Sequence, residues 1–188
     1  MRPNSTHEVQ DSGREEIVRL HCGLTKIPGR MAPADAKDER GNPFELKSVT
    51  KSGVTTARDV GRHTIRGWRR KYWIIAHGRN LDEGFEMDAL YVGHPDDLAP
   101  CFDRLEKRIE DDWEACETVL KAARRSRVKE AVIDRVKNFC ERGITINNPK
   151  IPFRLVEERC TQLDHRSPNM AQEQLARFVT SRPIASAK

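Results

Sequence analysis

Hydrophobic and polar positions along the chain separate strand-like stretches from helix-like ones. Residues 43–50 alternate with a period of two after a Gly-Asn-Pro turn. Residues 72–78 (YWIIAHG) are almost continuously apolar, and residues 85–93 (FEMDALYVG) alternate again. These three stretches predict strands, the last two paired through the loop RNLDE.

Helical periodicity governs two other parts of the chain. The stretch REEIVRLHCGL (residues 14–24) predicts a short helix, with Ser12 as its N-cap. Between residues 103 and 142, apolar side chains recur at spacings of three and four in two series, divided by the basic break KAARRSR. The first series is Leu105, Ile109, Trp113, Cys116 and Leu120, and the second is Val128, Val132, Val136 and Phe139. This pattern predicts two amphipathic helices in a hairpin.

The order of helix, strands and helices predicts an α/β or α+β fold around a small mixed sheet. A chain of 188 residues is long enough for one domain with a substantial core. We expect a single domain over residues 1–163, with a helical insertion at residues 109–142. Residues 164–188 are expected to form a polar C-terminal tail.

Charge and cysteine usage narrow the class of protein. Arg and Lys number 34 against 29 Asp and Glu, a net charge of +5, which mildly favours a polyanionic partner. Five scattered cysteines without a CxxC pair indicate reduced thiols. No stretch is apolar and long enough for a signal peptide or a membrane span. We expect a soluble, cytoplasmic protein that has no membrane partner.

The strand at residues 43–50 carries the first candidate chemistry. Glu45 and Lys47 share one face of a strand, while Phe44 and Leu46 face the other. Asp35, ten residues upstream of Glu45, can fold back beside them. Two converging carboxylates need a cation between them, and Mg²⁺ suits such oxygen ligands. A neighbouring lysine can orient or help deprotonate an attacking water. The alternative is an exposed surface ion pair, which a bare E-x-K describes equally well.

Two further stretches are candidates for nucleic-acid contact. The stretch RHTIRGWRRK (residues 62–71) contains no acidic residue, and its His63 can touch phosphate. A solvated helix face is the alternative. The stretch INNPKIP (residues 146–152) offers Asn147 and Asn148, and an Asn can contact adenine with two hydrogen bonds. Because Asn-Pro is also a turn dipeptide, residue type alone favours a plain turn.

Several of these stretches together resemble a known family. The segments GLTKIPGRMAPADAKDERGNPFELKS, YWIIA and INNPKIP, with QDSG at residues 10–13 and HPDDL at 94–98, are similar to the PvuII-like Type II restriction endonucleases of the PD-(D/E)xK fold. The segments occur in the same order with nearly the same spacing, over residues 9–104 and 143–158.

The resemblance implies a Mg²⁺-dependent homodimer that embraces double-stranded DNA and cuts both strands of a short palindrome. It further implies a partner DNA methyltransferase that protects host DNA. Asp35 and Glu45 would be the metal ligands and Lys47 the catalytic lysine. Asp11 would contact DNA at the centre of the site. Asn147 and Asn148 would belong to the DNA-recognition surface.

Three departures from the family pattern affect these expectations. A run of three histidines used for base recognition is replaced here by Ala57-Arg58-Asp59. Arg58 can contact guanine and Asp59 can accept from cytosine N4, so we expect a changed reading of G·C pairs. An Arg-Asp ion pair on a helix is the equal alternative. Trp68 stands at the position of an active-site tyrosine.

The third departure concerns the dimer. QDSG stands close to the start of the chain, so we expect most of the N-terminal helix that builds the family's dimer to be missing. We expect the inserted hairpin at residues 109–142 to supply a replacement subunit contact.

The leading hypothesis is therefore a Type II restriction endonuclease. A repair or junction nuclease on the same fold is one alternative, and INNPKIP, which belongs to sequence reading, argues against it. A catalytically inactive DNA-binding protein is the other. The intact set of Asp35, Glu45 and Lys47 argues against that reading.

Overall fold

The computed structural model describes residues 6–29, 34–50, 52–82 and 84–184, with side chains from Gly13 onward. The chain divides into two compact units. Unit 1 comprises residues up to Thr56, Gly67–Ala99 and residues from Lys150 onward, and unit 2 comprises Ala57–Arg66 and Pro100–Pro149. The single domain over residues 1–163 stays a prediction.

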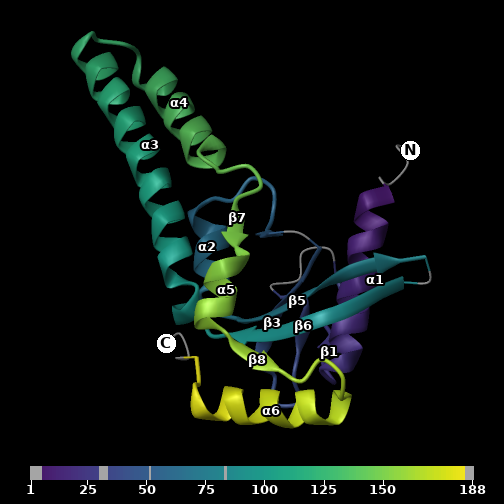
Figure 1. The fold of residues 1–188 in the computed structure, drawn as a ribbon. Helices are drawn as coiled ribbons and strands as arrows, with labels where there is room; N and C mark the ends of the chain where they lie inside the picture. The colour runs from purple at the N-terminus through teal and green to yellow at the C-terminus, as the bar shows by residue number, and fades with distance from the viewer. Residues whose placement is uncertain (1–5, 30–33, 51, 83, 185–188) are drawn as a thin grey trace. The chain divides into compact units, whose positions relative to one another are not determined.

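Unit 1 is built on a mixed sheet. Its elements are α1 (Thr6–His21), β1 (Thr25–Lys26), β2 (Ala36–Lys37), β3 (Pro43–Val49), β4 (Gly53–Thr55), β5 (Tyr72–Leu81), β6 (Gly84–Gly93), the 3-10 helix η1 (Pro95–Asp97), β7 (Lys150–Pro152), α5 (Phe153–Arg159), β8 (Thr161–Leu163) and α6 (Pro168–Ser181) (Figure 1). The six-stranded sheet has the order β1-β2-β3-β5-β6-β8. Only β3 and β5 pair in parallel among its neighbouring described strands, and β4 and β7 form a separate antiparallel pair. The predicted α/β class with a mixed sheet and its three strands is confirmed.

The core of unit 1 lies on one face of this sheet. Alternate residues of β3, β5 and β6 point into it, as the period-two pattern requires. Helices α1 and α6 bury their apolar stripes against the same face. The buried side chains from the strands are Phe44, Leu46, Tyr72, Ile74, Ala76, Leu90 and Val92, and those from the two helices are Val18, Cys22, Ala171, Leu175, Phe178 and Val179.

Helix α1 ends in a glycine cap. Gly23 has a φ of +65°, Leu24 N donates to Arg19 O at 3.0 Å, and Gly23 N donates to Leu20 O at 3.1 Å. This pair of bonds is the Schellman motif, which favours glycine at the left-handed position. A Cβ on Gly23 would also lie 2.8 Å from Gln172 Cδ on α6. The flexible end of the Gln172 side chain would have to move to make room for it, so the positive φ is the main reason for glycine at this position.

Helix α6 corrects the sequence interpretation of the C-terminal segment. Residues 164–188 were expected to form a polar tail, but Pro168–Ser181 is a helix that buries four apolar side chains in the core. Ser167 caps its N-terminus by accepting a hydrogen bond from Met170 N. The helix is amphipathic. Most of its residues are polar, and its buried apolar side chains form only a short stripe along one side.

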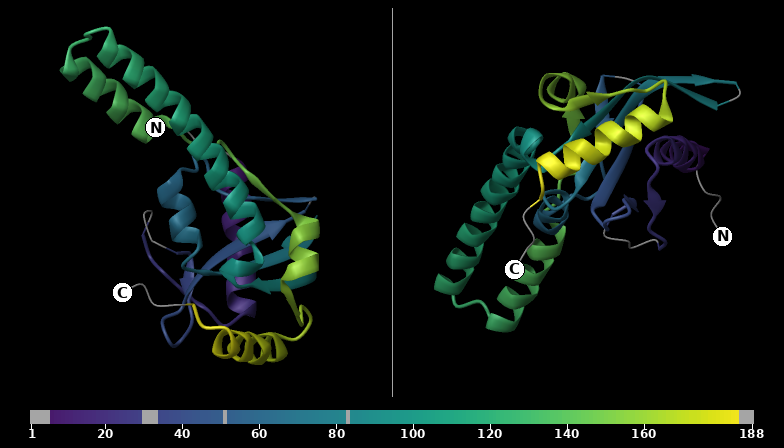
Figure 2. Two further views of the ribbon diagram at one scale, coloured as in Figure 1. Left: turned by 90° about the vertical axis from the view of Figure 1, so that its left-hand side faces the viewer. Right: turned by 90° about the horizontal axis from the view of Figure 1, so that it is seen from below.

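Unit 2 contains the helical hairpin that the sequence predicts. Helix α3 (Ala99–Arg125) and helix α4 (Glu130–Gly143) lie side by side (Figure 2). The segment before α2 (Arg62–Trp68) pairs with the segment after α4, because Val60 and Ile146 exchange two backbone hydrogen bonds of 2.9 Å. Among the described residues, no helix is long and apolar enough to cross a membrane.

Candidate active site

Strand β3 places Glu45 and Lys47 on the face opposite the core. Phe44 and Leu46 are buried in the core, so the alternation turns the two charged side chains to the other side. Lys47 Nζ lies 3.0 Å from Glu45 Oε1. Both side chains are largely buried, with exposed fractions of 16% for Lys47 and 11% for Glu45. An ion pair this buried differs from the exposed surface pair that was the alternative interpretation.

Asp35 joins this pair from the position just before β2, the strand next to β3 in the sheet. Its backbone is fixed on both sides, since Asp35 N donates to Phe44 O at 3.0 Å and Asp35 O accepts from Ile27 N at 3.1 Å. Its Oδ2 atom accepts a hydrogen bond from Leu46 N at 2.8 Å and lies 3.8 Å from Lys47 Nζ. The turn at Gly41-Asn42-Pro43 therefore returns the carboxylate of Asp35 to the Glu45–Lys47 pair.

Two further charged residues belong to this cluster, and the sequence interpretation assigned neither to it. Glu15 Oε1, on α1, lies 3.5 Å from Lys47 Nζ. Lys71 Nζ, from the turn before β5, lies 2.5 Å from Glu45 Oε2. Glu15 had one signal in the sequence, because it precedes buried Val18 and Cys22 at helical spacings of three and seven. Lys71 had none, since it stands at the end of a run of basic residues.

The pKa values of the three carboxyl groups in this cluster are shifted by burial and by the neighbouring charges. Burial raises the pKa of Glu15 to about 7, and the Asp35 and Glu45 carboxylates add to the effect while Lys47 opposes it. Burial also raises the pKa of Asp35, with Lys47 again opposing. Burial alone would raise the pKa of Glu45, but Lys47 and Lys71 outweigh it and hold that pKa below its usual value. The cluster therefore has carboxylates whose negative charge is only partly compensated by the two ammonium groups.

The oxygen donors of this cluster suit a hard divalent cation. Among the described residues, however, no three His, Cys, Asp or Glu side chains are arranged as a metal site. At Glu45, one carboxylate oxygen faces Lys47 and the other faces Lys71. A metal would have to replace one of these ammonium groups at Glu45. The residue types fit a divalent ion, and the raised pKa of Asp35 marks the charge that such an ion would neutralise.

A cavity of about 410 Å³ opens beside Lys47 and Glu15. Arg14 and Lys150 line it, together with the hydroxyl-bearing side chains of Ser48, Thr50, Ser52, Thr55 and Thr56. Basic and hydroxyl groups are the donors that phosphate oxygens accept from in protein–DNA contacts. The cavity can thus hold a phosphodiester next to the carboxylates.

The predicted DNA-recognition residues are brought together in unit 2. In the antiparallel pairing of Val60 with Ile146, Asp59 and Arg58 run alongside Asn147 and Asn148. All four side chains are exposed, and Asp59 (φ 52°) and Asn148 (φ 46°) adopt the left-handed conformation. Arg58 and Asp59 precede α2, so the alternative of an ion pair on a helix is wrong.

The other two predicted contacts have different positions. His63 is exposed on α2. Asp11 falls within α1, but its side chain lies outside the described residues, so its contact with DNA stays a prediction.

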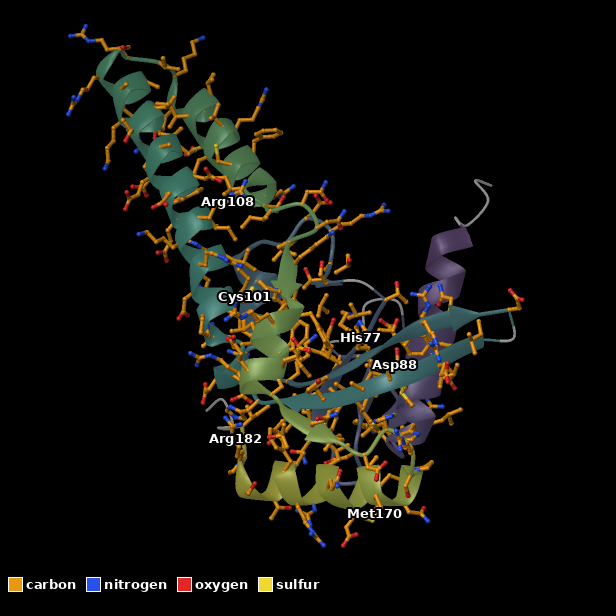
Figure 3. All side chains as sticks on the ribbon, viewed as in Figure 1. His77, Asp88, Cys101, Arg108, Met170 and Arg182 are labelled. Atoms are coloured by element: carbon orange, nitrogen blue, oxygen red, sulfur yellow. The ribbon has the colours of Figure 1, made fainter. Side chains whose placement is uncertain are left out.

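Several aromatic side chains near the sheet are structural. Trp68 is 2% exposed, and its ring meets that of Trp73 edge-on with centroids 5.5 Å apart. His77, on β5, packs against the ring of Phe153 at 4.7 Å (Figure 3). Trp68 is thus a core residue.

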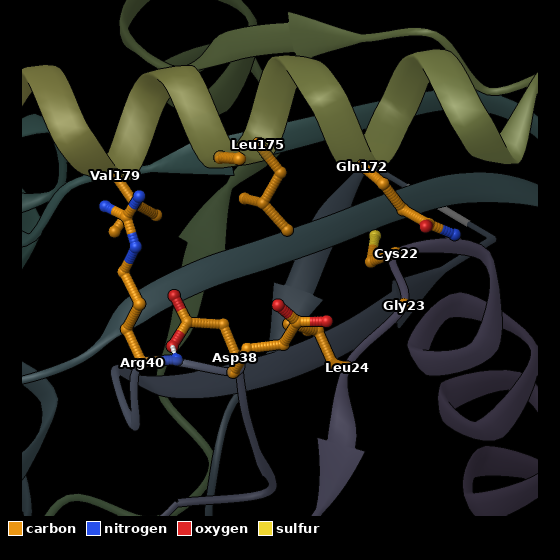
Figure 4. Close-up of a pocket in the computed structure, with 10 residues that line it drawn as sticks. Cys22, Gly23, Leu24, Asp38, Arg40, Gln172, Leu175 and Val179 are labelled. Atoms are coloured by element: carbon orange, nitrogen blue, oxygen red, sulfur yellow. Dashed lines mark hydrogen bonds between the residues drawn. The ribbon is translucent and has the colours of Figure 1, made fainter.

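A second cavity of unit 1, about 280 Å³, lies between α6 and the end of α1 (Figure 4). Leu24, Leu175 and Val179 form its apolar part. Asp38, one of two carboxylate residues that line it, accepts hydrogen bonds from Arg40 N, Asn42 N and Asn42 Nδ2 at 2.7–3.0 Å. Asp38 therefore stabilises the turn before β3, and we assign this cavity no chemistry.

The comparison with known protein families decides the identity of the fold. A family model, restriction endonuclease PvuII, matches residues 6–121. The chain belongs to the PvuII restriction endonuclease family. It is therefore a Type II site-specific endonuclease, a hydrolase with DNA as its substrate, and its sheet and helices form a restriction-endonuclease-like fold.

The extent of the match separates two parts of this PvuII-family enzyme. The matched range contains Asp35, Glu45 and Lys47 together with α1, the strands up to β6 and most of α3. It ends before α4, so the second helix of the hairpin and the Asn147-Asn148 segment lie beyond it. Enzymes of this kind generally use divalent metal ions, and the carboxylate cluster lies in the matched part.

Proposed function

We propose that this PvuII-family endonuclease hydrolyses phosphodiester bonds of duplex DNA at a short palindromic site and requires Mg²⁺. In this proposal Asp35 and Glu45 are the metal ligands and Lys47 is the catalytic lysine. The observation that carries it is the convergence of the three side chains, with Lys47 Nζ 3.0 Å from Glu45 and 3.8 Å from Asp35 beside a phosphate-sized cavity.

Bound Mg²⁺ would supply Lewis-acid stabilisation of the phosphate and a lowered pKa for an attacking water. The chain's own residues set up the reaction around it. Asp35 keeps its carboxylate fixed through the hydrogen bond from Leu46 N, and Glu45 is fixed by β3. Arg14 and Lys150 line the cavity and would hold the non-bridging oxygens of the scissile phosphate.

The role of Lys47 follows from its surroundings. Burial alone would lower its pKa, but Glu45, Glu15 and Asp35 together raise it above the ordinary lysine value. Lys47 therefore stays protonated in the arrangement observed. It would orient the attacking water and stabilise charge on the phosphorus as the leaving oxygen departs. We do not assign it the removal of the water's proton.

Digestion of a large viral DNA tests this proposal. The purified protein is incubated with Mg²⁺ or with EDTA, alongside Asp35→Ala, Glu45→Gln and Lys47→Met. Asp88→Asn is the matched control, because Asp88 is an exposed carboxylate on β6 (Figure 3). We expect discrete bands that require Mg²⁺, disappear in the three site variants and persist in the control.

Other outcomes would favour the alternative functions. A smear of products that needs Mg²⁺ would indicate a repair or junction nuclease on the same fold. DNA that stays uncut but shifts on a gel at low salt would indicate an inactive DNA-binding protein. Sequencing the ends of discrete fragments would identify the recognition site and show whether it is palindromic.

We propose that Arg58, Asp59, Asn147 and Asn148 read base edges and that His63 contacts phosphate. Support comes from the Val60–Ile146 pairing, which gathers the four exposed side chains on adjacent segments. Arg58 would contact guanine, Asp59 cytosine and the asparagines adenine. Asp11 would contribute a contact at the centre of the site.

Cleavage of a library randomised across the site separates these roles. Arg58→Ala or Asn147→Ala should relax the preference at one base pair by about 1–3 kcal/mol, which is roughly 5- to 150-fold. His63→Ala should weaken binding to all sequences by a similar factor. Unchanged base preferences in Arg58→Ala and Asn147→Ala would remove the two segments from base recognition.

We further propose that the enzyme acts as a homodimer, since two sites are needed to cut both strands of a palindrome. The hairpin of α3 and α4 is the proposed subunit contact. Helix α4 exposes an apolar stripe, with Val132 49%, Val136 41% and Phe139 76% exposed. A stripe of this kind is typical of a helix that pairs with another.

Sedimentation velocity tests the dimer. Phe139→Asp combined with Val132→Asp should shift the protein to a monomer, while Lys137→Asp on the same helix should leave the dimer intact. A chain without residues 109–142 that remained dimeric would refute the hairpin contact.

A partner methyltransferase and a cytoplasmic location complete the proposal. An enzyme that cuts a short site would damage host DNA unless the same site is modified. A DNA methyltransferase gene adjacent to the gene for this chain is the expected observation.

A further inference from the structure

Unit 2 contains a cavity of about 510 Å³ to which the proposed function assigns only Asp59 and His63. It lies among the first turn of α2, the middle of α3 and the end of α4. Its size is within the range of roughly 300–1,000 Å³ that is typical of ligand pockets. Basic, aromatic and hydroxyl side chains line it, namely Arg62, His63, Arg66, Trp113, Arg142 and Thr145.

The chain brings two cationic segments together at this cavity. The backbone bonds between Val60 and Ile146 fix the start of α2 beside the end of α4. A Cβ on Gly61 would lie only 3.6 Å from Thr145 Cγ2, which shows how closely the two segments approach. Ile65 is fully buried and anchors α2, so that Arg62 and Arg66 on the same helix remain exposed.

The arginines of this cavity differ from six other arginines of the chain in their ion pairing. Arg19, Arg79, Arg124, Arg154, Arg177 and Arg182 each form a salt bridge with an acidic side chain. In the part of the chain that the structure describes, Arg62, Arg66 and Arg142 form none. Asp59 and Glu141 also line the cavity, yet neither pairs with these three guanidinium groups. Three unpaired positive charges therefore face one cavity that has two carboxylates.

We infer that this cavity binds backbone phosphates of the DNA substrate. Guanidinium groups contact phosphate oxygens with two hydrogen bonds, and the Thr145 hydroxyl adds a donor. The inference rests on the proposed function, because it takes the DNA read by Asp59 and Asn147 as the ligand. Arg62 follows Asp59 by three residues and Thr145 precedes Asn147 by two. DNA contacted by Asp59 would lie at the rim of this cavity, because Asp59 is one of its lining residues.

Phosphate contacts have a measurable signature. Each phosphate neutralised by the protein adds about 0.9 to the slope of log Kd against log salt concentration. Such contacts also support specific and non-specific DNA equally, because the backbone is the same in every sequence. Base contacts would instead change the ratio of specific to non-specific affinity.

The test measures DNA binding in EDTA over a series of salt concentrations. The double variant Arg62→Gln/Arg66→Gln and the single variant Arg142→Gln are compared with Arg177→Gln. Arg177 is a matched control because it is exposed on α6 and paired with Glu173. We expect the slope to fall by about two in the double variant and by about one in Arg142→Gln. Specific and non-specific affinity should fall together, and Arg177→Gln should change neither.

Folding of the variants is checked by thermal melts, and Arg66→Lys serves as a second variant that keeps the charge. It should retain the salt slope of the parent protein.

Trp113 provides a direct probe of the cavity. It is partly exposed, whereas Trp68 and Trp73 are 2% and 0% exposed, so iodide should quench Trp113 selectively. Bound DNA should protect the parent protein from iodide, and Trp113→Phe should remove the quenchable signal. The double arginine variant should lose this protection at salt concentrations where the parent keeps it.

Two results would overturn the inference. One is an unchanged salt slope in both arginine variants. The other is protection of Trp113 by inorganic phosphate or a mononucleotide but not by duplex DNA, which would make the cavity a small-ligand site. Either result leaves the proposed function intact if the parent still cuts DNA with Mg²⁺. Loss of cutting in the parent would count against the proposed function alone.

Discussion

Lys71 donates a 2.5 Å hydrogen bond from its Nζ to Oε2 of Glu45, from the turn that leads into β5. Both side chains are only 11% exposed. Since Lys47 faces the other oxygen of Glu45, this carboxylate has an ammonium group at each oxygen. Lys71 therefore stabilises the metal-free protein at the position where the proposed ion would bind.

Replacing Lys71 with Met should destabilise the metal-free protein. The buried carboxylate of Glu45 would lose one charged partner, which costs about 2 kcal/mol. Denaturant unfolding in EDTA measures the change. Adding Mg²⁺ should narrow the difference between variant and parent, because the ion replaces the lost charge. Lys137→Met, on exposed α4, is the control and should be neutral in both conditions.

Glu15 predicts a pH dependence of the metal-free protein. Its pKa of about 7 lies above the usual 4.5, so the folded state holds this proton more tightly than the unfolded chain does. The contribution of Glu15 to stability therefore falls as pH rises from about 4.5 to 7. In EDTA, the Tm of Glu15→Gln relative to that of the parent should rise between pH 5 and pH 8.

The neighbouring Glu16 serves as a control, because its pKa is shifted in the opposite direction and its effect on stability should depend on pH in the opposite way. Its hydrogen bonds with Arg19 lower the pKa of Glu16, so its stabilising effect is present at neutral pH and is lost as the pH falls through that lowered value. Glu16→Gln should lower Tm at pH 8 and become neutral in acid. A pH-independent gain in Glu15→Gln would mean that the Glu15 carboxylate is not desolvated in the folded protein.

Arg182 connects the end of α6 to η1. It donates two hydrogen bonds of 2.8 Å to Asp97, and its carbonyl oxygen accepts from Tyr72 Oη at 2.8 Å (Figure 3). Arg182→Ala would leave the mostly buried Asp97 carboxylate without its cation. We expect a loss of about 2 kcal/mol in unfolding free energy by chemical denaturation. Arg177→Ala, which removes an exposed pair, should cost less than about 0.5 kcal/mol.

Gly23 is favoured mainly by its backbone conformation. Gly23→Ala would place a Cβ at a φ of +65° and 2.8 Å from Gln172 Cδ. We expect a loss of about 1–2 kcal/mol, measured by thermal unfolding. The double variant Gly23→Ala/Gln172→Ala should regain the stability lost through the contact with Gln172. It should still lack the stability lost through the positive φ. Full recovery would mean that the conformation contributes nothing.

The residues that sequence reasoning placed correctly are those governed by local periodicity. Alternation on one strand places Glu45 and Lys47 on one face, and a short turn returns Asp35 to them. The hairpin of α3 and α4 follows in the same way from spacings of three and four. These features depend on neighbours in sequence, so a single sequence contains the necessary information.

The residues that it missed depend on contacts between distant parts of the chain. Lys71 reaches Glu45 because β3 and β5 are adjacent parallel strands, which no local pattern reveals. Helix α6 was mistaken for a polar tail because only four of its apolar side chains face the core. Its burial depends on the face that β3, β5 and β6 form together, and a moderately apolar stripe alone does not predict it.

The pairing of Val60 with Ile146 has a consequence for how such enzymes diverge. It consists of two backbone hydrogen bonds, and neither depends on a particular side chain. Residues 58 and 147 can therefore be exchanged while the backbone pairing persists, whereas the left-handed backbone at Asp59 and Asn148 favours Asp, Asn or Gly at those two positions. Under the proposed assignment of these residues to base reading, the target sequence can change by a few substitutions on two short segments, while the cluster of Asp35, Glu45 and Lys47 stays unaltered.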